Sequence, residues 1–462
     1  MKGMTRVSLA VKRYFQRMHP ASLVILSYLS MALLGMLLLS LPIASTGDPI
    51  SPINALFTST SAICVTGLVV VDTGTAFTAF GKTVIMALIQ LGGLGVMTFS
   101  VFFFLFLGKG LGLKERWIIT ESFTPAPIRE IRSLVKSIFL FTFLVEGTGA
   151  LLLFFHWRHE MSSGSALFTG LFHSISAFCN AGFSFFSDSF VNYKGSLLLN
   201  ATILSLIVIG GIGFPVIYEF IMRFRMHRAG RRTNLSLHSK VVLTTTAILI
   251  VVGALLLFLL ERHNQIAGLS GKEEFLTSLF QSITARTAGF NTLNISALGG
   301  ATLFILIILM FVGASPGSCG GGIKTTSLAV LVGILRNKIK GRKSVDLFNR
   351  TVPEETVSRA LAIFILAVLT VTVGLILLLL TQSNPQDPGR TNFLAYLFET
   401  VSAFGTVGLS MGVTPTLTFG GKIVIIILML LGRAGLLTVA YVFTRRVSGG
   451  LYRYAEEKVM IG

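Results

Sequence analysis

Long apolar stretches alternate with polar or glycine-rich segments along the whole chain. A helix that crosses a bilayer needs roughly 20 mostly apolar residues, and eight stretches approach or exceed that length. They run approximately over residues 22–41, 83–107, 134–157, 197–222, 241–260, 302–335, 360–380 and 422–443. The pattern predicts an all-α polytopic membrane protein with eight spans, the sixth of which is broken in the middle.

Four short segments between these spans repeat one pattern. Each begins with Leu-Phe, continues with small and hydroxyl residues, and ends in a glycine that Leu or Phe follows. The closing glycines are Gly67, Gly182, Gly289 and Gly408, separated by 115, 107 and 119 residues. Each segment is too short to cross a bilayer, so the predicted unit is helix, re-entrant pore loop, helix, repeated four times.

The four predicted loops point to one central pore. Non-helical backbone at membrane depth is tolerated where it is buried in protein or lines a watery cavity. Glycine lets carbonyl oxygens turn toward an axis, where they replace the water shell of a cation. A single such loop is ordinarily a packing turn, but four matching copies favour the pore. Carboxylates are not placed symmetrically, with Glu399 alone at the start of the fourth loop, which favours a carbonyl filter suited to potassium.

The break in the sixth span lies at residues 313–327, where one proline and five glycines oppose a regular helix. This segment is expected to form a mobile loop below the filter; the alternative is a kinked helix held by its neighbours. Lys324 either snorkels to the membrane surface or stands in the ion path and repels cations. Arg433, inside the last span, is expected either to hold this loop or to line the lower pore.

Three smaller expectations concern individual residues. The glycines at 92–95 and 210–213 in the second and fourth spans are expected to permit close helix packing. Arg286 in the third loop is expected either to pair with Glu399 across the filter or to reach the outer water. The cysteines Cys64, Cys179 and Cys319 are too few for a disulfide framework.

Composition and charge narrow the function classes. The chain is 53% hydrophobic and 12% charged, with mean hydropathy +0.80, which excludes an ordinary soluble domain. Of the 38 Lys and Arg residues, 28 lie in the two tails and in three alternate connections. The positive-inside rule then predicts both termini in the cytosol, with the N-terminal segment a retained tail. The net charge of +19 is expected to orient the protein and to contact anionic lipids, not nucleic acid.

The loop sequences TSAICVTGL, HSISAFCNAGFS, QSITARTAGFNT and ETVSAFGTVGLS resemble those of the Trk, Ktr and HKT superfamily of potassium transporters over essentially the whole chain. Without extra N-terminal helices, the chain is most similar to the bacterial Ktr membrane subunit. The resemblance implies a filter made of each glycine and its preceding neighbour. It also implies that the broken segment acts as a gate. The filter set is Thr66, Gly67, Ala181, Gly182, Ala288, Gly289, Val407 and Gly408; the gate set is Gly313, Ser315, Gly317, Gly320, Gly321, Gly322 and Lys324, with Arg433 beside it.

One departure affects the third loop. From phenylalanine to glycine the spacing is nine residues there and ten in the other three loops. A less symmetric pore is therefore expected, and the assignment of Ala288 rests on a weaker match.

The resemblance further implies potassium uptake across the cytoplasmic membrane, with sodium as a coupling or activating ion and no covalent cofactor. Expected partners are a second copy in a homodimer, a soluble cytosolic nucleotide-binding ring and anionic lipids. An alternating-access secondary transporter is the main alternative, but its repeats are usually inverted whereas these share one orientation. A membrane enzyme is disfavoured because the sequence has no His/Cys/Asp/Glu cluster with metal-ligand spacing.

The expected organisation follows from these elements. It comprises a cytosolic tail 1–20, repeat 1 at 21–108, a cytosolic loop 109–133, repeat 2 at 134–222, a cytosolic loop 223–239, repeat 3 at 240–335 with the gate loop 313–327, a cytosolic loop 336–359, repeat 4 at 360–444 and a cytosolic tail 445–462.

Overall fold

The computed structural model of the chain describes residues 20–95, 128–230, 234–342, 344–382 and 393–436. Most of the predicted first tail, much of the loop 109–133 and the last tail lie outside the described residues. The far ends of the second and eighth predicted spans also lie outside them.

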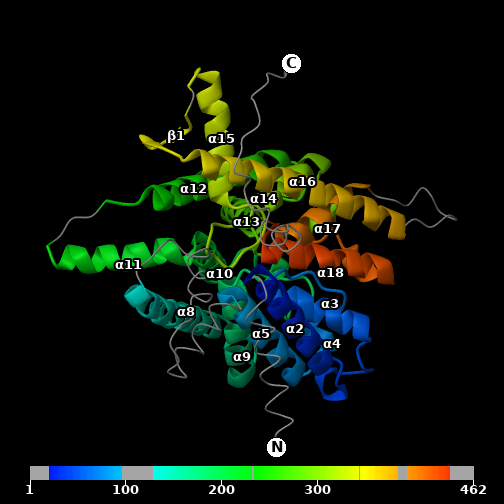
Figure 1. Cartoon of the computed structure of the whole chain (residues 1–462). Coiled ribbons are helices and arrows are strands. Elements are labelled where there is room, and N and C mark those ends of the chain that lie inside the picture. The colour runs from blue at the N-terminus through cyan, green and yellow to red at the C-terminus, as the bar shows by residue number, and fades with distance from the viewer. Residues whose placement is uncertain (1–19, 96–127, 231–233, 343, 383–392, 437–462) are drawn as a thin grey trace, which may run out of the picture.

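Four helical units surround a common centre, and their colours separate them in Figure 1. In each unit an outer helix packs on a pore helix and on an inner helix. In chain order these are α2 (Pro20–Leu39), α3 (Pro52–Ile63) and α5 (Ala79–Leu94); α8 (Ile128–Trp157), α9 (Ser163–Phe178) and α10 (Leu197–Ile212); α12 (Leu237–Glu261), α13 (Gly271–Thr284) and α14 (Gly300–Phe311); α16 (Glu354–Gln382), α17 (Phe393–Gly405) and α18 (Phe419–Ala434). The predicted fold class is confirmed.

Shorter elements connect the helices within and between the units. They are α4 (Thr73–Ala76), α11 (Phe214–Arg228), α15 (Thr325–Ile339) and 3₁₀ turns at Pro42–Ala44, Val191–Tyr193, Ile295–Ala297 and Thr414–Thr416. A two-stranded antiparallel hairpin, β1 (Asp346–Leu347) and β2 (Arg350–Thr351), follows α15. This hairpin is a small exception to the all-α prediction, and its turn residues Phe348 and Asn349 both have positive φ, as a two-residue hairpin turn requires.

The distribution of apolar and polar side chains between the surface and the interior differs from that of a soluble protein. The outer helices expose large apolar side chains, such as Leu37 on α2, Leu144 on α8 and Val251 on α12. The pore helices bury hydroxyl side chains instead, including Ser61 and Ser176. This arrangement suits a chain whose perimeter meets lipid and whose polar groups must find partners inside the protein.

The outer helices are long and apolar enough to cross a membrane. Within the described residues, Ser22–Leu39, Lys136–Trp157, Leu237–Glu261 and Glu354–Gln382 are long and apolar enough to span, and α10 with α11 forms a bent pair. The pore helices have 12 to 16 residues, which at 1.5 Å per residue is shorter than a bilayer core of about 30 Å. They are re-entrant elements, as predicted.

The continuous fourth span predicted over 197–222 is wrong. The helix ends at Ile212, Gly213 adopts φ +99°, and α11 leaves at 95° to α10. Pro215 lies in the first turn of α11, where a missing N–H costs nothing, so Gly-Phe-Pro ends one helix and begins another. Gly95 and Gly435 end α5 and α18 with φ of +83° and +86°, and the three inner helices therefore end at equivalent places.

The starts of the pore helices are capped in different ways. Pro52 is the first residue of α3, but the Ser51 side chain makes no capping bond. Ser162 caps α9, and Ser270 forms a capping box with Glu273 on α13.

Candidate functional site

The four repeat glycines meet in a closed ring, which we call the glycine ring (Gly67, Gly182, Gly289 and Gly408). A Cβ added to Gly67 would collide with the carbonyl oxygen of Ala181, and one on Gly408 with that of Thr66. A Cβ on Gly182 would lie 2.9 Å from the Ala288 oxygen, and one on Gly289 would lie 2.6 Å from the Val407 oxygen. Each glycine thus contacts the next repeat, in the order 1, 2, 3, 4.

All eight predicted filter residues therefore lie at this ring. The carbonyl oxygens of Thr66, Ala181, Ala288 and Val407 each lie against the adjacent glycine. The ring glycines have φ between +70° and +91°, a region that residues with a Cβ rarely adopt. A side chain at any of the four positions would meet both backbone strain and its neighbour's backbone.

The same turn is built in every repeat. Two residues before each glycine stands a non-glycine residue with positive φ, namely Val65, Asn180, Thr287 and Thr406. A hydroxyl residue at the end of each pore helix then bonds the turn: Ser61 and Ser402 accept from the amides of Gly67 and Gly408, while Ser176 and Thr284 donate to the carbonyls of Phe183 and Phe290. The pore-helix C-termini, which bear partial negative charge, end beside the ring and favour a cation there.

The shorter third loop keeps this geometry. The missing residue falls between Thr284 and Gly289, because Thr284 occupies the place of the hydroxyl residues in the other repeats. The amide of Ala288 bonds to the carbonyl four residues back, whereas Thr66, Ala181 and Val407 bond five residues back. The ring remains closed with Ala288 in its expected place, so the deletion tightens the turn without displacing it.

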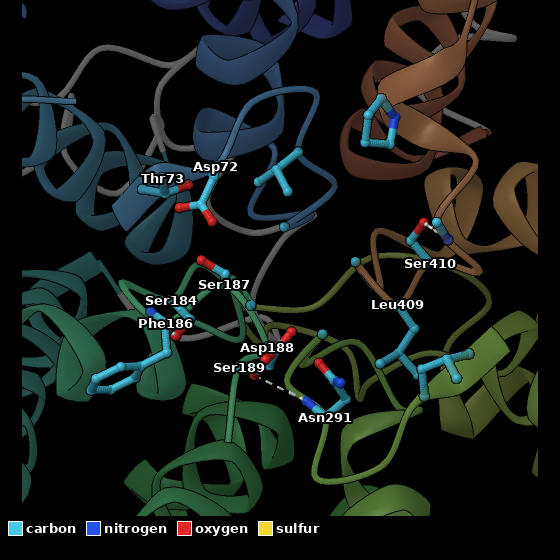
Figure 2. A pocket seen from close by; sticks show the side chains of 18 of the residues that line it. Asp72, Thr73, Ser184, Phe186, Ser187, Asp188, Ser189, Asn291, Leu409 and Ser410 are labelled. Carbon is cyan, nitrogen blue, oxygen red and sulfur yellow. Dashed lines mark hydrogen bonds between the residues drawn. The ribbon is translucent and has the colours of Figure 1, made fainter. Parts of the chain in front are cut away.

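One side of the ring opens into a cavity of about 690 Å³, which we call the vestibule. All four ring glycines line it. Figure 2 shows side chains from four separate parts of the chain around it, including Asp72, Asp188, Asn291 and Ser410. The Asp72 carboxylate also accepts from the amides of Gly74 and Thr75 at the start of α4. Two carboxylates at a cavity that leads to the ring favour the local accumulation of cations.

On the other side of the ring lie residues 313–324, which we call the inner loop. A Cβ on Gly320 would collide with the Thr287 hydroxyl. The amide of Gly321 donates to the Thr406 hydroxyl at 3.0 Å. Thr287 and Thr406 lie two residues before ring glycines, so the inner loop lies directly against the turns of repeats 3 and 4.

Hydrogen bonds from a neighbouring repeat hold the inner loop. The amides of Ser315 and Cys319 donate to the carbonyls of Gly211 and Gly210 at 3.1 and 3.3 Å. In return, the amide of Phe214 donates to the Gly317 carbonyl at 2.9 Å. The segment is a folded loop and not a kinked helix. The α10 glycines also pack closely, since a Cβ on Gly210 would collide with the Phe178 carbonyl, and they hold the loop in addition to packing.

The two predicted basic residues both bond to backbone carbonyls of the inner loop. Lys324 donates from Nζ to the Gly320 carbonyl at 2.6 Å. Arg433 donates to the carbonyls of Cys319 and Gly92. Arg433 thus joins α18, the inner loop and α5, which agrees with one of its two expected roles. The amino group of Lys324 is tied to the loop itself.

The suggested ion pair between Arg286 and Glu399 does not form. In the part of the chain that the structure describes, the Glu399 carboxylate accepts hydrogen bonds from Ser410, Met411 and Thr414. All three of these partners belong to its own repeat. Arg286 is 7% exposed and its Nε has no hydrogen-bond partner among the described residues.

Sequence reasoning missed two buried polar groups. Glu146, in the middle of α8, is 3% exposed and accepts from the Gln90 side-chain amide at 3.1 Å. His173, on the second pore helix, is fully buried and bonds to Ser184 and Phe185 beyond the ring. The signals were present, since both are polar residues inside apolar segments and His173 matches Glu399 in the repeat alignment.

Sequence comparison relates the chain to transport proteins. Residues 5–450 match the model of the TrkH family, described as cation transport protein. The Ktr system potassium uptake protein B of Bacillus subtilis is 40% identical, covering 96% of this chain and 97% of its own. The potassium/sodium uptake protein NtpJ of Enterococcus hirae is 35% identical, covering 98% of this chain and 99% of its own.

A solved structure has the same fold. The crystal structure of the potassium transporter TrkH from Vibrio parahaemolyticus superposes with a TM-score of 0.71, covering 92% of this chain and 84% of that one at 20% identity. At this identity the similarity concerns the fold alone.

Proposed function

The chain belongs to the TrkH family of cation transport proteins, and from this premise we propose that it takes up potassium through the glycine ring. The observation that supports this most directly is the closed ring, in which carbonyl oxygens from four repeats lie against four positive-φ glycines. Such oxygens replace the hydration shell of a cation that passes in single file. Relatives whose names include potassium uptake support the choice of ion.

In this proposal the vestibule is the entrance and the inner loop is the gate. A cation entering from the vestibule meets Asp72 and Asp188, loses water at the ring, and is stopped by the inner loop on the far side. Opening requires the loop to leave Thr287 and Thr406. The bonds to α5, α10 and α18 make the closed position sensitive to movement of those helices.

The proposed setting is the cytoplasmic membrane, with the basic segments and both termini in the cytosol and the vestibule outside. The chain is proposed to act as a homodimer under a cytosolic nucleotide-binding regulatory ring, with sodium as coupling or activating ion and anionic lipids around the basic loops. The names of two relatives as members of a Ktr system support a partner subunit.

The test is ion flux into liposomes that contain this purified chain. Potassium flux that exceeds sodium flux at least tenfold is expected, at a low basal rate that rises when a nucleotide-binding partner is added. Equal potassium and sodium flux from folded protein would contradict the proposed filter. Flux that saturates at the turnover of a carrier would instead favour the alternating-access transporter.

A further inference from the structure

One position in the pore helices differs among the repeats in a regular way. The residue after each Leu-Phe pair is polar, and the four residues are Thr58, His173, Gln281 and Glu399. None is more than 1% exposed. A buried polar group is costly unless it is hydrogen-bonded, so its partners show what the position does.

In repeat 4 this residue holds the segment beyond the ring. The Glu399 carboxylate accepts from the Ser410 hydroxyl, from the Met411 amide at 3.2 Å and from the Thr414 hydroxyl at 2.8 Å. Ser410 in turn accepts from the Gly412 amide at 2.9 Å, which closes a short serine turn. The segment that follows Gly408 is thus hydrogen-bonded to α17, the pore helix that precedes Gly408.

Repeat 2 has the same arrangement with different chemistry. His173 Nε2 lies 3.1 Å from the Ser184 hydroxyl and accepts from the Phe185 amide at 3.3 Å. Its Nδ1 then donates to the Thr169 carbonyl at 2.8 Å, so one neutral tautomer satisfies both ring nitrogens. Ser184 accepts from the Phe186 amide at 3.0 Å. Ser184 and Ser410 both stand two residues after the ring glycine, and the bonded amides stand three and four residues after it.

Repeats 1 and 3 lack this connection. Thr58 Oγ1 and both polar atoms of the Gln281 amide have no hydrogen-bond partner within the described residues. The residue two positions after the ring glycine is Val69 in repeat 1 and Asn291 in repeat 3, and the Asn291 amide donates to Ser189 of repeat 2. We call repeats 2 and 4, in which the pore helix is hydrogen-bonded to the segment after the ring glycine, braced, and repeats 1 and 3 unbraced. Because the ring order is 1, 2, 3, 4, braced and unbraced repeats alternate, and the two braced repeats lie opposite each other.

We propose that His173 and Glu399 are positioning residues for the filter, fixing two opposite walls of its outer end and thereby setting potassium over sodium discrimination. The inference rests on the proposed function. A carbonyl filter distinguishes the two ions by the separation and number of its oxygens, so the walls that cannot move set the spacing. The filter backbone of repeats 1 and 3 then adjusts to the ion, while that of repeats 2 and 4 stays fixed.

The first test removes the acceptors while keeping the bulk. His173→Phe and Glu399→Leu are each expected to lower the ratio of potassium to sodium flux in proteoliposomes at least fivefold. His173→Gln and Glu399→Gln keep an acceptor oxygen and are expected to stay within threefold of the original ratio. A purely structural role would lower flux of both ions together and leave the ratio unchanged.

Matched controls occupy the same position in the other repeats. Thr58→Val and Gln281→Leu remove groups without described partners, so the flux ratio is expected to stay within twofold. Gln281→Leu is also expected to leave the thermal midpoint unchanged or to raise it, because it removes an unsatisfied buried amide. A loss of selectivity in these controls equal to that of the braced repeats would overturn the alternation.

Two smaller substitutions keep the proposal testable if the His173 and Glu399 variants misfold. Ser184→Ala and Ser410→Ala each remove one hydrogen bond to His173 or Glu399 from the vestibule side, and each is expected to lower the ratio about threefold. If the parent protein is selective and both serine variants remain equally selective, the brace has no role in discrimination. If the parent protein shows no selective potassium flux, the proposed function itself fails, which is a separate outcome.

Discussion

The two sides of the glycine ring follow different rules. The ring that lines the vestibule is built by nearly the same turn in all four repeats, with positive φ at the ring glycine and two residues before it. On the other side the repeats diverge. The inner helices of repeats 1, 2 and 4 end at a single glycine, whereas repeat 3 has the inner loop in that place.

This difference indicates what each side must do. A cation on the axis needs oxygens from all sides, so every repeat must supply the same turn. A gate needs one obstacle, and a single loop from one repeat suffices if its neighbours hold it. Symmetry is kept where four contributions are equivalent and, under the proposed function, is lost where a single segment forms the gate.

The largest expected effect comes from breaking the ring. Gly67→Ser places a side chain where a Cβ already collides with the Ala181 carbonyl, and it strains a residue with φ +91°. We expect the potassium to sodium flux ratio to fall at least tenfold, which corresponds to about 1.4 kcal/mol of discrimination. Gly47→Ser is the control in the same repeat, since nothing lies within 4 Å of a Cβ there. Unchanged selectivity in Gly67→Ser would remove Gly67 from the filter.

The next effect comes from removing the obstacle. Deletion of residues 317–322 takes away the part of the inner loop that contacts Thr287 and Thr406. Basal flux without any partner is expected to rise by about an order of magnitude while the flux ratio is retained. The measurement is liposome flux normalised to monodisperse protein. Unaltered or lower flux in folded protein would contradict gating by this loop.

A smaller effect is expected from loosening the loop without removing it. Arg433→Gln removes a cation that bonds the carbonyls of Cys319 and Gly92, and hydrogen bonds to charged groups contribute about 2 kcal/mol. Basal flux is expected to rise several-fold, by less than the deletion causes. Lys422→Gln is a control on the same helix, because Lys422 bonds Asn54 far from the loop. Equal increases in both variants would show a general loosening of α18.

The smallest expected effect best distinguishes a role in the gate from a role in the ring. Thr406→Val removes one neutral hydrogen bond from the Gly321 amide, worth about 1 kcal/mol, and leaves the shape of the turn. Basal flux is expected to rise two- to fivefold with an unchanged potassium to sodium ratio. A changed ratio at unchanged basal flux would mean that Thr406 belongs functionally to the ring and not to the gate.

Much of this arrangement was predictable because it repeats. The repeated Leu-Phe and Gly positions predicted four re-entrant loops and the ring residues, and proline with five glycines predicted the broken sixth span. Two predictions failed for local reasons. The fourth span bends at Gly213 because Phe214 and Pro215 begin a new helix. Arg286 and Glu399 do not pair because Ser410, Met411 and Thr414 already occupy the carboxylate.

The sequence by itself determined the class of protein, the number of repeats and the residues of the ring, because apolar length and internal repetition are local properties. Only the tertiary structure decided which repeats neighbour each other, that Arg433 joins the inner loop to α5, and that His173 and Glu399 have partners while Thr58 and Gln281 have none among the described residues. Those outcomes include contacts between segments 341 residues apart, as between Arg433 and Gly92. No local pattern specifies such contacts, since a buried polar side chain takes its role from whichever group the fold brings within hydrogen-bond distance.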